Sequence, residues 1–176
     1  MFVEEYDESE HSKECYAHFG LAVYYSQVLE HQLVNMLVLL KRTQGLLPTE
    51  DDFDTLYERK FSNTLGQLIN EIKQVFELTD EELQEMKSIL KTRNFIVHDF
   101  FKEKITLTFT RTGRNEIIEE LRSFVNRVKI MDARLVELSS ELLEKMGITQ
   151  QMLDDEARMA KEEEINKEYE GNFGKA

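Results

Sequence analysis

Hydrophobic residues recur at three- and four-residue steps along most of this chain, which is the spacing of one buried face of an α-helix. The pattern predicts long helices over residues 12–42, 62–76 and 115–145 and a shorter, acidic one over 50–58. Another helix should open after Thr79, because Thr79 and Glu82 match the Thr-x-x-Glu capping box. Thr49 should cap the short helix, and glycines at 45 and 147 should end the helices before them.

Two segments depart from this spacing. Residues 105–110 alternate apolar and hydroxyl side chains, which predicts an extended connector or half of a short hairpin, with Gly113 supplying a turn. Residues 150–169 are mostly charged, so they should form a helix, capped by Thr149, that packs weakly or projects. Residues 171–176 should be disordered.

One proline and seven glycines among 176 residues leave few breaks for turns, which favours long helices over a β fold. We therefore expect an all-α protein: an antiparallel up-and-down bundle of about four main helices, with a short helix and a charged C-terminal helix in addition. Residues 1–147 should form the bundle domain and residues 148–176 the charged helix with a flexible tail.

The compartment is constrained by the single cysteine and by the absence of targeting patterns. Cys15 alone can form no disulfide within the chain, which fits a reducing compartment. The first ten residues lack the basic and apolar regions of a signal peptide. No apolar run approaches the roughly 20 residues that a membrane span needs. The expected location is the cytoplasm, with no membrane contact.

The formal net charge is −13, which argues against nucleic acid as a partner of the chain as a whole. Its distribution changes that picture. Residues 87–134 hold eleven Lys and Arg against six Asp and Glu, a local net charge of +5, and the rest of the chain is strongly acidic. Any RNA would therefore bind in this window.

The window contains the one segment with an evident chemistry, Arg93-Asn94-Phe95-Ile96-Val97-His98. On a helix Asn94 and His98 share a face, and the long side chain of Arg93 can reach toward it from about 140° around. An imidazole exchanges protons near neutral pH, and a guanidinium binds two phosphate oxygens. Together they suit cleavage of RNA by its own 2′-hydroxyl, for which no metal or other cofactor is needed.

The spacing from Arg93 to His98 resembles the Rx4-6H motif of HEPN domains, in which an arginine, an adjacent polar residue and a histidine lie on one helix of an α-bundle. The resemblance covers about residues 12–145 and implies a metal-independent endoribonuclease of toxin–antitoxin, phage-defence or RNA-processing systems. It also implies a homodimer whose two motifs form one cleft. Arg93 and His98 would be the catalytic pair and Asn94 their support. Lys91, Lys102 and Lys104, close to the motif, are the expected RNA-binding residues.

Other interpretations remain open. In the second interpretation Arg93 pairs with an acid such as Glu30 or Glu71, as part of a non-catalytic helical module that binds RNA, a nucleotide or a protein. A third possibility is a neutralising, antitoxin-like or regulatory role, in which the acidic C-terminal helix shields a basic toxin. His11, Glu14 and His18 share a helix face, a spacing that can bind a metal, but a surface helix end explains them much better, and we predict no metal site.

Overall fold

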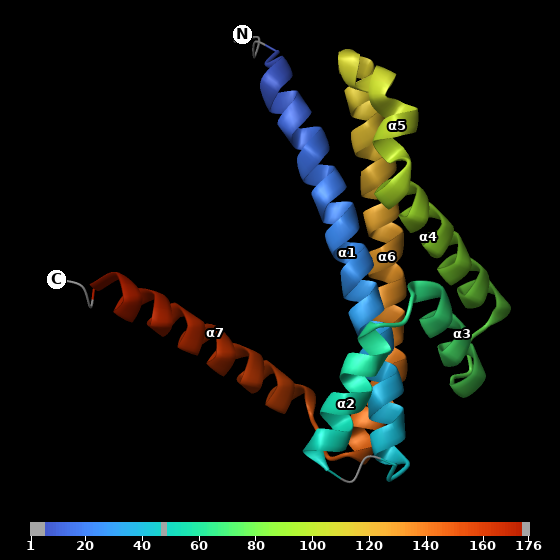
Figure 1. Ribbon diagram of the computed structural model, residues 1–176, viewed down its shortest axis with the longest axis vertical. Coiled ribbons are helices and arrows are strands. Elements are labelled where there is room, and N and C mark those ends of the chain that lie inside the picture. Colours follow the sequence, from blue (N-terminus) through green and yellow to red (C-terminus); the bar gives the residue numbers. More distant parts are fainter. Residues whose placement is uncertain (1–5, 47–48, 174–176) are drawn as a thin grey trace.

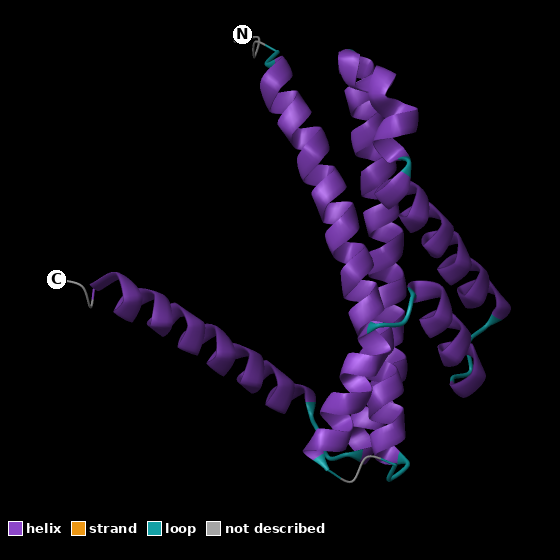
Figure 2. Cartoon of the chain, in the orientation of Figure 1, coloured by secondary structure: helices purple, strands orange, loops and turns teal. Residues whose placement is uncertain are grey.

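The computed structural model describes residues 6–46 and 49–173, and within these ranges the chain is helical without a strand (Figures 1 and 2). The expected all-α helical bundle is confirmed. Its elements are seven α-helices and one 3-10 helix: α1 (Glu8–Thr43), α2 (Glu50–Phe61), α3 (Leu65–Val75), α4 (Asp80–His98), α5 (Phe100–Lys104), η1 (Ile105–Phe109), α6 (Arg111–Lys145) and α7 (Gln150–Phe173).

The two longest helices, α1 and α6, lie side by side and run in the same direction (Figure 1). Contacts at successive levels show this register: Cys15 Sγ donates to the Arg114 carbonyl at 3.6 Å, and Gln32 Nε2 lies 3.4 Å from Ser139 Oγ. Helix α4 runs opposite to both and packs against them. The long helices alternate in direction along the chain, as an up-and-down bundle requires. Because α4 runs opposite to α1, the next long helix, α6, runs in the same direction as α1.

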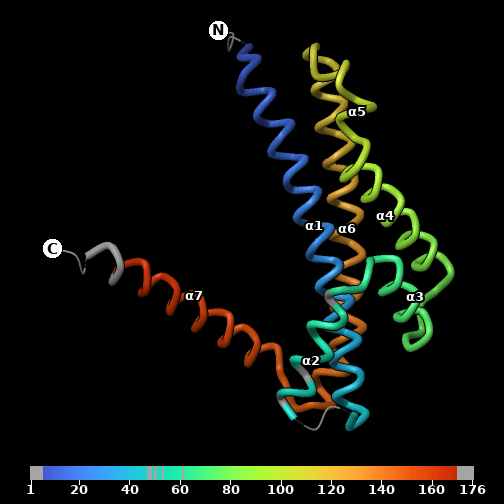
Figure 3. The backbone as a smooth tube through the Cα atoms, in the orientation of Figure 1, coloured from blue at the N-terminus to red at the C-terminus, as the bar shows by residue number. Residues whose placement is uncertain are grey.

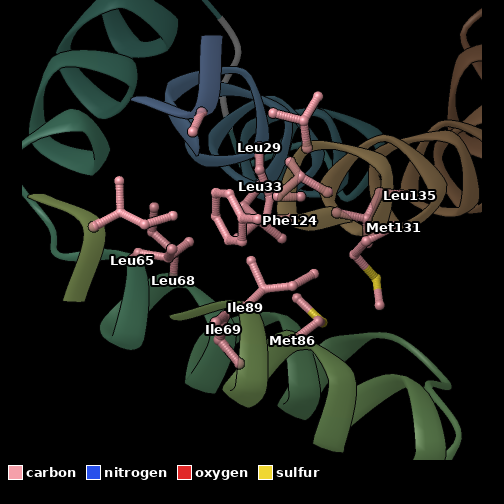
Figure 4. Close-up of a cluster of buried hydrophobic side chains, with 14 of the residues drawn as sticks. Leu29, Leu33, Leu65, Leu68, Ile69, Met86, Ile89, Phe124, Met131 and Leu135 are labelled. Carbon is pink, nitrogen blue, oxygen red and sulfur yellow. The ribbon is translucent and has the colours of Figure 1, made fainter. Parts of the chain in front are cut away.

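The core lies where α1, α3, α4 and α6 converge (Figure 4). The buried Phe124 of α6 meets Leu29 and Leu33 of α1, while Ile89 of α4 and Leu68 of α3 close the other side. Burying an aliphatic or aromatic side chain of this size stabilises a fold by about 1.5–3 kcal/mol. This cluster therefore fixes α4, the helix that carries the motif, against the α1–α6 pair.

Side-chain caps set the helix starts. Thr49 and Thr79 form the predicted capping boxes, with Asp52 and Glu82 respectively. Thr64 forms a third box with Gln67, so α3 begins three residues later than the predicted start at residue 62. Asp7 and Thr110 cap α1 and α6, which begin four residues earlier than predicted. Each such cap stabilises its helix by about 1 kcal/mol.

The prediction of an extended segment over residues 105–110 is wrong. Residues Ile105–Phe109 form a 3-10 helix, in which the Thr108 hydroxyl donates to the Ile105 carbonyl at 2.6 Å. An extended segment needs a partner strand, and the described chain offers none, so local hydrogen bonds satisfy its backbone instead. Gly113 likewise lies inside the first turn of α6 and not in a turn between strands.

Helix α7 leaves the bundle after Gly147, whose φ of +72° suits a residue without a side chain (Figures 1 and 3). It projects away from the other helices, which is one of the two arrangements expected for this charged segment. Residues 171–173, predicted to be disordered, continue this helix, and the rest of the predicted tail, 174–176, lies outside the described residues. No described helix is long and apolar enough to cross a membrane.

Candidate functional site

The Arg93–His98 motif occupies the last turns of α4, where the chain bends into α5. Ile96 is buried in the core, and Phe100, the second residue after the motif, is also buried. Asn94, Val97 and His98 are exposed. The buried residues hold the end of α4 firmly in place, so the polar residues of the motif are presented on a fixed surface.

Arg93 forms the principal link between the motif and α1. Its Nη2 donates to Glu30 Oε1 at 3.0 Å, and its Nη1 donates to the Asn94 side-chain oxygen at 3.2 Å. Both side chains of the ion pair are about three-quarters buried. The Nε of Arg93 is buried and makes no hydrogen bond within the described residues. The guanidinium is therefore held by a carboxylate of another helix and by the neighbouring amide.

His98 is the last residue of α4 and its side chain is exposed. It lies one helical turn beyond Asn94, so the amide and the imidazole share the outer face of the helix. The structure thus brings Arg93 and Asn94 into direct contact and leaves the imidazole accessible beside them. Asn94, Val97 and His98 are all exposed, so the motif presents these side chains on the surface of α4.

The three lysines expected to bind RNA differ in their surroundings. Lys91 is exposed on α4. Lys102 is exposed and lies 3.7 Å from Asp99 and 3.8 Å from Glu103. Lys104 is paired with Glu120 of α6 at 2.8 Å, and that hydrogen bond raises the pKa of its ammonium group. Lys104 therefore ties α5 to α6, and of the three lysines Lys91 and Lys102 are the more accessible to a ligand.

The basic window is largely neutralised within the fold. Seven of its eleven cationic side chains contact carboxylates, several of which come from distant parts of the chain. Arg127 binds Glu85 at 2.7 Å, for example, and Arg134 binds Glu82 at 2.6 Å. Glu82 and Glu85 lie outside residues 87–134, so the charge of that window does not include them. The local excess of +5 is therefore not one free positive surface.

A buried arginine that the sequence did not single out lies near the start of α6. Arg114 is only 3% exposed, and its guanidinium donates to the Tyr6 hydroxyl at 2.7 and 3.1 Å and to Glu8 at 3.1 Å. It also donates to the Thr108 carbonyl, and its hydrogen bond to Tyr6 raises its pKa. Arg114 thus joins the segment before α1 to η1 and α6. Nothing in its sequence neighbourhood distinguishes it from exposed arginines.

The possible metal ligands do not come together. His11 Nδ1 lies 3.1 Å from the Tyr6 hydroxyl, while His18 Nε2 lies 3.8 Å from Glu14. No group of three metal-binding side chains is found among the described residues. Cys15 is buried, and burial raises the pKa of its thiol, which disfavours the reactive thiolate.

No family model matches this chain, and no curated protein or solved structure is significantly similar to it. The class of protein that the structure defines is an all-α helical bundle with a projecting C-terminal helix. Within it, the outer face of α4 at Asn94 and His98 is the candidate functional site, with Arg93 held beside them by Glu30.

Proposed function

We propose that this protein is a cytoplasmic, HEPN-like, metal-independent endoribonuclease that acts as a homodimer. The observation that supports this proposal best is the arrangement at the end of α4. Asn94 and His98 are exposed on one face, and the guanidinium of Arg93 is held at 3.0 Å by Glu30 and at 3.2 Å by Asn94. An arginine, an amide and an imidazole on one rigid helix end meet the needs of RNA transesterification.

In the proposed reaction the 2′-oxygen of a ribose attacks the adjacent phosphorus while His98 accepts the hydroxyl proton. The bond from phosphorus to the 5′-oxygen breaks, and that oxygen takes a proton from a second acid, for which His98 of the partner subunit is the candidate. The products are a 2′,3′-cyclic phosphate and a 5′-hydroxyl. Arg93 would bind the phosphate oxygens and stabilise the charge that develops on them.

A dimer is part of the proposal because one copy presents its motif on an open surface. Val97 lies beside Asn94 on that surface and is 39% exposed. A second copy that packed its α4 end against this one would bury the valines and place two motifs on either side of a shared cleft. Lys91 and Lys102 would then lie beside the bound RNA strand.

A second candidate is a non-catalytic helical module that binds RNA, a nucleotide or a protein partner, including an antitoxin-like or regulatory one. The neutralised basic window favours it, because seven cationic side chains already contact carboxylates. The ion pair of Arg93 with Glu30 is the structural role that the sequence left open for this arginine.

The test is RNA cleavage in the presence of EDTA by the wild type, His98→Ala and Arg93→Ala. We expect both substitutions to lower the cleavage rate at least 100-fold, the size of effect typical of a lost general base or charge-stabilising donor. His11→Ala and Arg158→Ala remove the same functional groups outside the motif and should leave the rate unchanged. Arg158 is exposed on α7, where it contacts Asp155 of the same helix at 2.8 Å.

Each outcome separates the candidates. Cleavage that persists in both motif variants rules out the proposed mechanism. Equal inactivity of the wild type and the variants favours the binding module, which a filter-binding assay with labelled RNA then examines. Loss of activity in the two motif variants alone, with cyclic phosphate ends on the products, supports the nuclease.

A further inference from the structure

A hollow of about 320 Å³ lies between α1 and α6, on the side of these helices away from α4. Lys129, which lines the hollow, follows Arg127 by two residues, and Arg127 contacts Glu85 of α4. Two residues turn an α-helix by about 200°, so Lys129 lies on nearly the opposite side of α6 from α4 and its motif. A ligand bound in this hollow would therefore leave the motif face free.

Apolar side chains from both helices form much of the lining. Val125 of α6 is buried, Tyr25 of α1 packs against the core, and Leu21 is 44% exposed. Asn126 adds an amide, which can both donate and accept hydrogen bonds. The volume is at the lower end of the range of small-molecule sites, roughly 300–1,000 Å³. The hollow can therefore hold the apolar body of a small ligand beside a few polar groups.

Lys129 gives the hollow a positive charge that no carboxylate of the described chain neutralises. Its ammonium lies 4.5 Å from the centre of the Tyr25 ring, a cation–π contact that holds it over the hollow. The other two basic side chains of the lining are less available, because Arg122 Nη2 and His18 Nε2 lie 3.5 and 3.8 Å from Glu14. One cation without a carboxylate partner favours a ligand with one negative charge.

We propose that this hollow binds a small organic carboxylate. The aromatic or aliphatic body of the ligand lies against Leu21, Tyr25 and Val125. Its carboxylate accepts hydrogen bonds from the Lys129 ammonium and the Asn126 amide. None of the seven lining residues carries a carboxylate, so no like charge opposes the ligand inside the hollow. A phosphate monoester would bring up to about two negative charges, more than Lys129 alone balances.

Two other hollows that involve α1 lack this combination. The one of about 580 Å³ near the start of α1 is lined by Glu10 and Glu14, and its Lys13 lies 2.5 Å from Glu10. Two carboxylates there oppose an anion. The one of about 430 Å³ near the start of α7 has no charged residue in its lining, so it offers no partner for a carboxylate. The hollow at Lys129 joins apolar surface to an available cation.

NMR titration of the full-length, 15N-labelled protein with 3-phenylpropionate tests the site. We expect a Kd of about 0.1–1 mM, ordinary for a ligand of about eleven heavy atoms. The shifted backbone signals should be those of the lining residues on α1 and α6. The neutral amide, 3-phenylpropanamide, should bind about tenfold more weakly, because it has the same body without the charge.

A charge-removing variant and a matched control locate the carboxylate. Lys129→Met keeps an unbranched side chain and should weaken 3-phenylpropionate binding about tenfold while leaving the amide unaffected. Lys87→Met removes the same charge from the exposed surface of α4 and should change neither Kd. Circular dichroism checks that both variants are folded.

Three results would overturn the proposal. The first is the absence of shifts at the lining residues, and the second is equal affinity for the acid and the amide. The third is equal weakening by Lys129→Met and Lys87→Met, because the charge would then act at long range and not in the hollow. Phenyl phosphate is titrated in parallel, and tighter binding of this dianion than of 3-phenylpropionate would overturn the assignment of a carboxylate.

Discussion

Gly113 is the glycine at which a single added methyl group should lower the stability of the protein most. A Cβ built on this glycine would lie 2.2 Å from the Leu107 carbonyl oxygen and 2.7 Å from Leu107 Cα. Ordinary van der Waals contact begins near 3.4 Å. Because the obstructing atoms belong to the backbone of η1, no side-chain rotation can relieve the overlap, and η1 would have to move about 1 Å from α6.

The expected cost follows from two opposing effects. Forcing an extra methyl into a packed site costs about 1–3 kcal/mol, and the rigid backbone here places Gly113→Ala toward the upper end. Alanine at this position regains at most about 1 kcal/mol from its better helix propensity. The net loss should be about 2 kcal/mol, a fall in Tm of roughly 4–8 °C for a chain of this size.

Gly20 supplies the control in the same fold. It is exposed inside α1, and a Cβ there would meet nothing within 4 Å. Gly20→Ala should therefore stabilise the protein by about 0.5–1 kcal/mol. Both variants are compared with the wild type by urea unfolding, followed by circular dichroism. If Gly113→Ala were as stable as the wild type or more so, the close approach of η1 to α6 would be refuted.

Three further predictions concern charged groups. Glu30→Gln and Arg93→Ala should show a coupling energy of about 1 kcal/mol in a double-mutant cycle by urea unfolding, and additive effects would contradict the ion pair. The hydrogen bond from the Thr79 backbone N–H, and next the one from Arg134, lowers the pKa of Glu82. Glu82→Gln should therefore destabilise the protein at pH 7, and this deficit should disappear as the pH falls below 4.5, the ordinary pKa of a glutamate. Burial raises the pKa of Asp132, so Asp132→Asn should raise Tm at pH 7 and lose that advantage toward pH 3.8, and a constant difference across the pH range would refute this.

The helices could be predicted from the sequence because local signals determine them. The Thr79–Glu82 capping box and Gly45 mark helix ends within a few residues of where the structure has them. Thr64 and Gln67 carried the same signal and would have corrected the start of α3. The prediction for residues 105–110 was wrong because alternating hydroxyl groups occur in a 3-10 helix as well as in a strand. Only the lack of a partner strand in the described chain favours the 3-10 helix over the strand.

The surroundings of the site could not be predicted in the same way. That α1 runs parallel to α6, and therefore which of its residues face α4, depends on packing between segments about 100 residues apart. Glu30 was one of two acids considered for Arg93, and only the fold selects it. The exposure of Val97 and the burial of Ile96 also depend on the rotation of α4, which adjacent apolar residues leave undetermined.

The ion pair between Arg93 and Glu30 is compatible with either proposed function, and its energy explains why. Each side chain keeps about a quarter of its surface exposed, so the pair contributes on the order of 1 kcal/mol. A phosphate brings more charge and can bind the guanidinium through two oxygens, which makes it a stronger ligand than one oxygen of Glu30. RNA could therefore displace Glu30 at a small cost in stability. In the absence of RNA, the carboxylate keeps Arg93 beside Asn94, so the same contact that stabilises the bundle would also preorganise the arginine for a phosphate.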